Sequence, residues 1–139
     1  MSGHPLTEVY RKAAIVVAHT YRPRLLYEGS WVDHTVAWYR TEARGHRDYL
    51  ERKDPVFSKW EPWEELSAWA YTSPYADEQN LVCIQENVSG TIVGYQCFFI
   101  ARYGQHLSVL NIRLVAKRAN PDQVKEWIVT VDELFADLE

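Results

Sequence analysis

Hydrophobic positions recur with two different periods along this chain. Up to about residue 80 they fall every three or four residues, which is typical of amphipathic helices. From residue 81 to 116 they follow a period of two, which is typical of strands, and the helical spacing returns at the C-terminus. The pattern therefore predicts an α+β fold in which N-terminal helices and a C-terminal helix pack on a sheet.

Two helices are predicted in the N-terminal part. The first covers about residues 5–19, with Pro5 in its first turn, which suits proline because no intrahelical bond is lost there. The second covers residues 30–54, because Ser30 can cap it, Asp33 follows three residues later, and Pro55 ends it. Six residues of the second helix share the stripe expected to face the core: Val32, Val36, Tyr39, Ala43, His46 and Leu50. A neighbouring stripe contains Trp31 and Trp38.

A third, short helix is predicted from Glu61, because Pro62 and two glutamates follow at the end where the helix dipole is positive. Three strand-like runs come next, at residues 81–86, 91–102 and 106–116, separated by the turn sequences NVSG and YGQ. They predict an antiparallel meander of three strands, or four if residues 25–28 add a short one.

The last helix has the clearest signal in the chain. Asn120 and Pro121 form a cap with proline in the first turn. One apolar face then continues to the C-terminus: Val124, Trp127, Ile128, Val131, Leu134, Phe135 and Leu138.

Composition narrows the classes of protein. A chain of 139 residues with 47% hydrophobic and 24% charged residues fits one globular domain, residues 1–139. The net charge of −4 disfavours direct binding to nucleic acid or to an anionic membrane. No run of about twenty apolar residues exists, and the first ten residues lack the pattern of a signal peptide. We therefore expect a cytoplasmic protein, in which Cys83 and Cys97 stay reduced.

Acidic charge is concentrated in two segments. Residues 54–80 carry six acidic and one basic side chain, a balance of −5, and residues 121–139 carry the same numbers. Residues 1–53 and residues 81–120 are mildly basic, each with a balance of +3. The acidic segments either form solvated faces or attract a basic partner.

Motifs for catalysis or metal binding are weak. Glu42 and His46 lie one helical turn apart in the predicted second helix, a spacing that can share a proton or a metal ion. A structural histidine in the core is the commoner outcome, and the sequence predicts no cofactor and no metal. An enzyme or small-ligand pocket near Glu42 and His46 stays open as an alternative.

Aromatic and acidic residues gather between positions 60 and 78. Tryptophan and tyrosine are frequent at binding hot spots, since they bury large area with few rotatable bonds, but they also fill cores. The sequence predicts the following contact residues for a protein partner: Trp60, Glu61, Trp63, Glu64, Glu65, Trp69, Tyr71, Tyr75, Trp31 and Trp38.

The preferred hypothesis is a small acidic protein that inhibits a partner by stoichiometric binding, as immunity proteins and phage-encoded inhibitors of bacterial defence do. The partner would be a basic nuclease or a nucleic-acid-handling complex, whose positive site the acidic surface covers. A structural subunit of a larger assembly is a further alternative, and it predicts self-association through the sheet.

Overall fold

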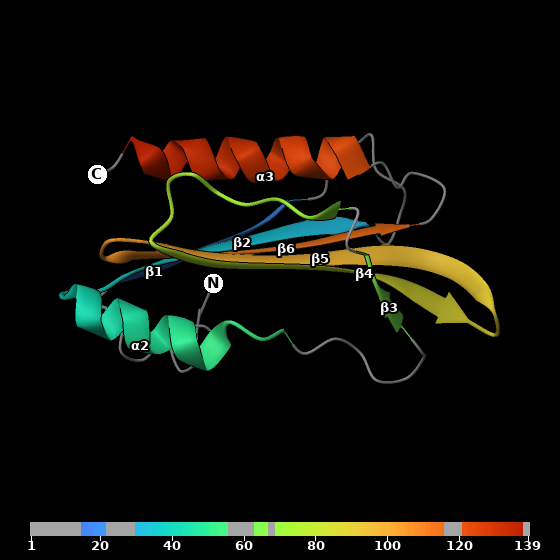
Figure 1. The fold of residues 1–139 in the computed structure, drawn as a ribbon, viewed down its shortest axis with the longest axis horizontal. Helices are drawn as coiled ribbons and strands as arrows, with labels where there is room; N and C mark the ends of the chain where they lie inside the picture. Colours follow the sequence, from blue (N-terminus) through green and yellow to red (C-terminus); the bar gives the residue numbers. More distant parts are fainter. Residues whose placement is uncertain (1–14, 22–29, 56–62, 67–68, 116–120, 138–139) are drawn as a thin grey trace.

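A six-stranded antiparallel sheet carries one helix on each face (Figure 1). The computed structural model describes residues 15–21, 30–55, 63–66, 69–115 and 121–137. In spatial order the strands are β1 (Ile15–Tyr21), β2 (Trp31–Trp38), β6 (His106–Val115), β5 (Thr91–Tyr103), β4 (Glu78–Val88) and β3 (Trp63–Glu65). The helices are α2 (Glu42–Arg52) and α3 (Pro121–Ala136). The α+β prediction is confirmed, but three or four strands were too few.

The central meander β4–β5–β6 is as predicted. A two-residue turn joins β4 to β5, and both of its residues, Ser89 and Gly90, have positive φ angles of 51° and 82°. Such turns match the twist of the strands they connect. Gly104, with φ of 60°, opens the turn between β5 and β6. These turns fix the register in which Cys83, Cys97 and Ile112 lie side by side across three strands.

The first predicted helix is wrong where the structure describes it, and the second is wrong over its first part; residues 42–52 of the second are helical and form α2. Residues 15–19 of the first belong to β1, and residues 31–38 of the second form β2; residues 5–14 lie outside the described residues. The cause is a spacing of four, as between Val32 and Val36, which puts two residues on one face of a helix and equally on one face of a strand. Ser30 does not cap a helix; its hydroxyl accepts a hydrogen bond from Val115 N at 3.0 Å.

Helix α2 begins twelve residues later than predicted. Thr41 is its N-cap, with an extended backbone and a side chain that accepts from Arg44 N. Its buried residues are Gly45, Asp48 and Tyr49, so His46 and Leu50, which were expected to face the core, are exposed.

Each face of the sheet has its own hydrophobic core. Helix α2 packs on one, which includes Tyr39, Tyr49 and Ile100. Helix α3 covers the other with Val124, Ile128 and Phe135. The α3 prediction is confirmed except for Leu134, which is 61% exposed; the predicted cap Asn120 and Leu138 lie outside the described residues.

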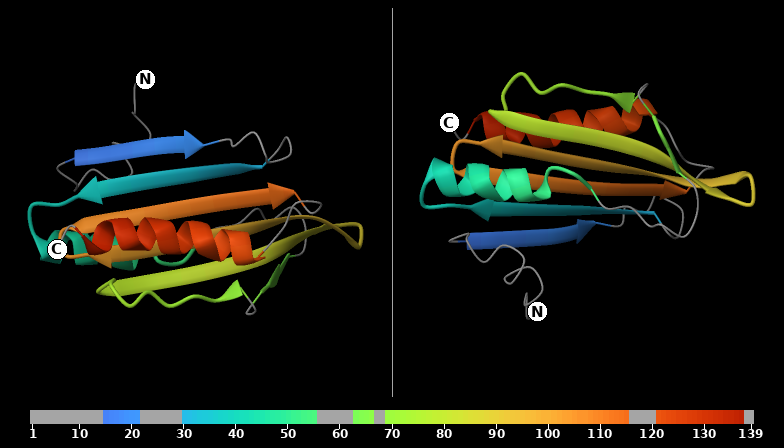
Figure 2. Two further views of the ribbon diagram at one scale, coloured as in Figure 1. Left: turned by 90° about the horizontal axis from the view of Figure 1, so that it is seen from above. Right: turned by 60° about the horizontal axis from the view of Figure 1, so that its bottom comes forward.

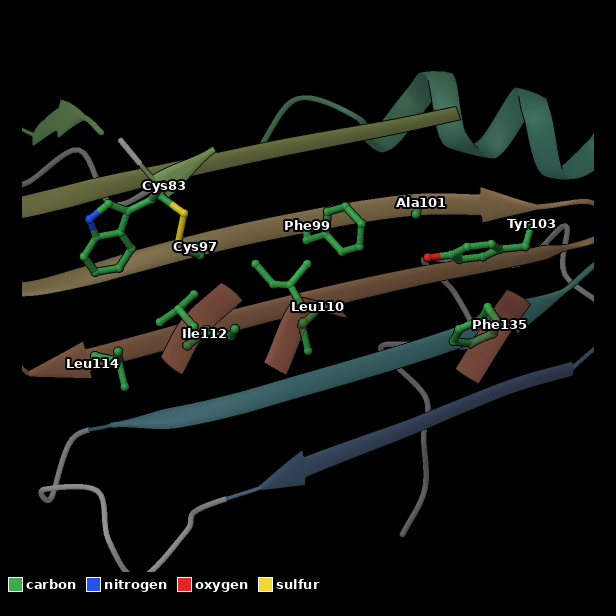
Figure 3. Close-up of a cluster of buried hydrophobic side chains, with 12 residues drawn as sticks. Cys83, Cys97, Phe99, Ala101, Tyr103, Leu110, Ile112, Leu114 and Phe135 are labelled. Carbon is green, nitrogen blue, oxygen red and sulfur yellow. A yellow bond between two sulfur atoms is a disulfide. The ribbon is translucent and has the colours of Figure 1, made fainter. Parts of the chain in front are cut away.

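Cys83 and Cys97 form a disulfide within the α3-side core (Figure 3). The expectation of two reduced thiols was therefore wrong. The register explains the bond, because the two residues are direct partners on β4 and β5 and their Cα atoms lie 4.1 Å apart.

Candidate functional site

Among the described side chains of the predicted aromatic segment, Trp69 and Tyr71 pack inward. Trp69 is 7% exposed and stacks on Tyr95 with ring centroids 5.0 Å apart, so it belongs to the α3-side core. Tyr71 is partly buried, whereas Glu65 and Tyr75 are exposed. Trp60 and Glu61 lie outside the described residues, as do the side chains of Trp63 and Glu64, whose backbones form β3 with Glu65 instead of the predicted helix. Of the aromatic side chains that the structure describes here, only Tyr75 is exposed.

Trp31 and Trp38 do not share a stripe. They are seven residues apart on one unbroken strand, so their side chains leave opposite faces of the sheet. Trp38 is on the α3 side with Val36, and Trp31 is on the α2 side. Both are partly buried.

Glu42 and His46 do come close in space, but as parts of a charged network that fastens α2 to the sheet. Arg102 on β5 is the centre of the network: its Nε donates to Glu78 at 2.6 Å, and its Nη1 lies 3.4 Å from Glu42 and 3.7 Å from Asp77. His46 contacts the other oxygen of Glu78. Burial lowers the pKa of Arg102, but hydrogen bonding and attraction to Glu78 and Asp77 outweigh it, so the pKa is raised.

This network does not resemble a metal site. Across the described ranges, no group of three or more His, Cys, Asp or Glu side chains is arranged to hold a metal ion. The three acids at Arg102, which are Glu42, Asp77 and Glu78, are already engaged by its guanidinium, which competes with a cation for them.

A serine and a histidine also meet on the α3 side of the sheet. His34 Nε2 lies 2.8 Å from Ser108 Oγ, which is within the reach of a base and a nucleophile. Ser108, however, is completely buried under α3, and its hydroxyl is inaccessible to a substrate. The pair joins β2 to β6 and contributes to packing.

Asp132 is the most unusual polar group in the described structure, and the sequence analysis missed it. Its carboxylate is fully buried on α3 and accepts three hydrogen bonds: from Ser73 at 2.7 Å, from Tyr71 at 2.8 Å and from Tyr103. Burial, followed by the hydrogen bond to Asp132, raises the pKa of both tyrosines. The cluster holds α3 and residues 71–73 against β5, so it sets the position of the helix.

One flank of α3 and the strands beside it form an apolar surface. Asp132 faces the β4 side, where residues 69–77 pass. Since successive helical residues are turned by about 100°, Leu134 faces the opposite side, toward β2 and β1. Trp127 and Val131 share that flank and are only partly buried. Figure 2 shows that α3 lies over the middle of the sheet and leaves β1 and β2 uncovered.

At one end, the uncovered strands carry apolar side chains on this face, next to His34. Val17 is the direct partner of Val36, and Ile15 of Trp38, so all four side chains lie on the α3 side. Val17 is 61% and Ile15 58% exposed. We call the surface formed by β1, β2 and this flank of α3 the apolar shelf. Its residues are Ile15, Val17, Val36, Trp38, Trp127, Val131 and Leu134.

The outer face of α3 next to the shelf is acidic. Four exposed carboxylates lie within about 60° of one another around the helix axis, and they are Asp122, Glu126, Glu133 and Asp137. The last turn of α3 has no basic residue, although cations there would stabilise the helix and anions oppose its dipole. Helix stability therefore does not explain the acids at this end.

Comparisons of this chain with models of protein families, with curated proteins and with solved structures gave no match. Among the described residues, neither helix is long and apolar enough to cross a membrane.

Proposed function

We propose that this protein binds another protein stoichiometrically, through the apolar shelf and the acidic face of α3. The observation that carries the proposal is the apolar shelf, on which three large aliphatic side chains, Ile15, Val17 and Leu134, are each more than half exposed. Exposed apolar residues are ordinary when scattered but mark binding surfaces when they gather. Trp38 and Trp127, both partly buried at the shelf, are the residue type most enriched at hot spots.

The partner has a matching chemistry. It carries apolar side chains that fill the shelf and lysines or arginines that lie against the carboxylates of α3, because opposite charges at the rim speed association and select the partner. A nuclease or a nucleic-acid-handling complex fits this description, since its phosphate-binding site is basic. Covering that site inhibits it, and the acidic face itself repels phosphates, so direct binding of nucleic acid is not part of the proposal.

This proposal moves the contact surface away from residues 60–78. Of the residues predicted from the sequence, Trp38 stays in it, while Trp69 and Tyr71 are assigned to the core and to the Asp132 cluster. Trp31, on the α2 side, is outside the proposed surface.

The disulfide also bears on the cellular compartment of the protein. The sequence favoured the cytoplasm, whereas disulfides persist mainly in oxidising compartments. The bond between Cys83 and Cys97 therefore favours an oxidising compartment. Alkylation of free thiols in freshly lysed native cells, followed by mass spectrometry, decides between the two: unmodified cysteines support the oxidising compartment, and modified cysteines support the cytoplasm.

The test of binding uses substitutions that keep shape and fold. Leu134→Gln removes apolar character while keeping a good helix former, and Val17→Thr does the same on a strand. The matched controls are Val88→Thr and Ile92→Thr, which change exposed residues on the β4–β5 hairpin, outside the shelf. Each purified variant captures proteins from a lysate of its own cells, and the affinity for any captured protein is then measured with the purified pair.

The expected result is a basic protein bound in a fixed stoichiometric ratio. The combined shelf variant should weaken its binding at least thirtyfold, about 2 kcal/mol, the threshold of a hot spot, and the hairpin controls should not. Glu126→Gln with Glu133→Gln should weaken binding at low salt and matter less at high salt. Equal affinity of the shelf and control variants would refute the assignment of this surface.

A further inference from the structure

The two edges of the sheet are built differently. Strand β3 has three residues, two of them glutamates, and its neighbour β4 has a register shift between Glu86 and Asn87. Short length, charge and irregularity are the features by which natural sheets prevent edge-to-edge pairing. The β3 edge is thus protected.

Strand β1 has none of these features. Its seven residues, IVVAHTY, include no lysine, arginine, aspartate, glutamate, proline or glycine. It pairs with β2 in one unbroken register from Ile15 to Tyr21, without a bulge. It is the last strand of the sheet, and no described strand lies on its outer side. An edge of this length, in unbroken register and without lysine, arginine or a carboxylate, is a template for another strand.

We propose that β1 pairs antiparallel with β1 of a second copy of this chain. A strand paired antiparallel with itself makes the same contacts in both directions, so the interface is closed and two-fold symmetric. The register that uses all seven residues centres on Ala18, and it places Val17 opposite His19 and Ile15 opposite Tyr21 of the second copy. The exposed residues Ile15 and Val17 then lie next to strand β1 of the second copy.

The paired sheet would have twelve strands, with both α3 helices on the same face because the two-fold axis is perpendicular to the sheet. Between them lies a floor of four strands, β2 and β1 from each copy. Five strand spacings separate β6 from its symmetry mate, about 24 Å. A helix is roughly 10 Å wide, so the floor has room for one further helix. If the proposed function holds, the two apolar shelves form a single groove for the partner.

The experiment measures the mass of the purified chain alone, without a partner, by light scattering and sedimentation over a wide dilution series. One copy has a mass of 16.3 kDa, and the proposal predicts twice that value. Val17→Lys places a charge at an exposed position beside the pairing edge, so this variant should have the monomer mass. Its melting temperature should equal that of the undimerised wild-type chain. Val88→Lys, the matched change at an exposed position on β4, should leave the dimer intact.

Ile15→Lys is a second edge variant, at the end of β1, and guards against misfolding of the first. Wild type and Val88→Lys as dimers, with either folded edge variant as a monomer, support the proposal. A wild-type monomer at every concentration, or a dimer that survives both lysine substitutions, overturns it. Because no partner is present, neither outcome bears on whether the shelf binds another protein.

Discussion

Replacing Tyr103 by phenylalanine tests the energetic role of the Asp132 cluster. The ring of Tyr103 is fully buried and stacks on Phe135 with centroids 4.9 Å apart, so phenylalanine keeps the packing and loses only the hydroxyl. That hydroxyl donates to a carboxylate with no solvent exposure. A hydrogen bond to a charged group contributes about 1.5 to 3 kcal/mol. We therefore expect Tyr103→Phe to lower the free energy of unfolding by about 2 kcal/mol.

The assay is urea unfolding followed by circular dichroism, with the slope against urea unchanged if the native fold is kept. The same substitution in an Asp132→Asn background isolates the charge. There the hydroxyl meets a neutral amide, so its removal should cost about 1 kcal/mol, and the difference of about 1 kcal/mol is the coupling between the two residues. Asp132→Ala is less informative. It leaves three hydroxyls without an acceptor, and the summed free-energy cost is comparable with the whole stability of a small domain.

Tyr75→Phe is the matched control, since Tyr75 is half exposed and lies on the segment that carries Tyr71 and Ser73. It should change stability by less than about 0.5 kcal/mol. The reasoning fails if Tyr103→Phe costs no more than Tyr75→Phe, or if its cost is the same with aspartate and asparagine at position 132. Either result would mean that packing alone holds α3 in place.

Three further predictions follow from described contacts. The pKa of Tyr103 is raised by burial and by its hydrogen bond to Asp132, so above pH 10 the unfolded chain releases this proton while the folded chain keeps it. Its contribution to stability is therefore full below that pH and falls by about 1.4 kcal/mol per pH unit above it, and alkaline urea titrations should show a shallower loss for Tyr103→Phe. Reducing the disulfide between Cys83 and Cys97, which are 14 residues apart, should cost about 3 kcal/mol, and an unchanged melting curve with reductant would contradict this. A Cβ at Gly94 would lie 2.8 Å from Glu86 Oε2 and 2.9 Å from the carbonyl oxygen of Leu114, so Gly94→Ala should destabilise by roughly 1 to 3 kcal/mol. At Gly45 the nearest atom is 3.4 Å away, so Gly45→Ala should be tolerated or should stabilise α2 by up to about 1 kcal/mol; equal effects of the two substitutions would refute this use of the geometry.

The strands and turns of the meander could be predicted because their signals are local. Alternation of side chains and a turn that contains Gly90 or Gly104 require no knowledge of the rest of the chain. The α3 helix was equally clear from its proline-containing first turn and its apolar face. In each case local preference and the final fold agree, which is why reading the pattern succeeded.

The helix predictions for the residues of β1 and β2 failed for a definable reason. Val32 and Val36 satisfy a helical and a strand period at once, and Ser30 with Asp33 imitates a cap. What places residues 31–38 in the sheet is the edge of β6, whose backbone groups pair with β2 over eight residues. A short window of sequence cannot show that β6 offers unpaired backbone groups to this segment.

For the candidate surfaces too, some features could be predicted from the sequence and others could not. By itself, the sequence determined the fold class, the acidic character of α3 and the presence of many aromatic rings. Only the tertiary structure decided which rings are buried, since Trp69 meets Tyr95 and Tyr71 meets Asp132 across long stretches of chain. It also decided that Val17 and Leu134, more than a hundred residues apart, border one surface. Burial depends on which elements become neighbours, and the packing of the whole chain determines those neighbours.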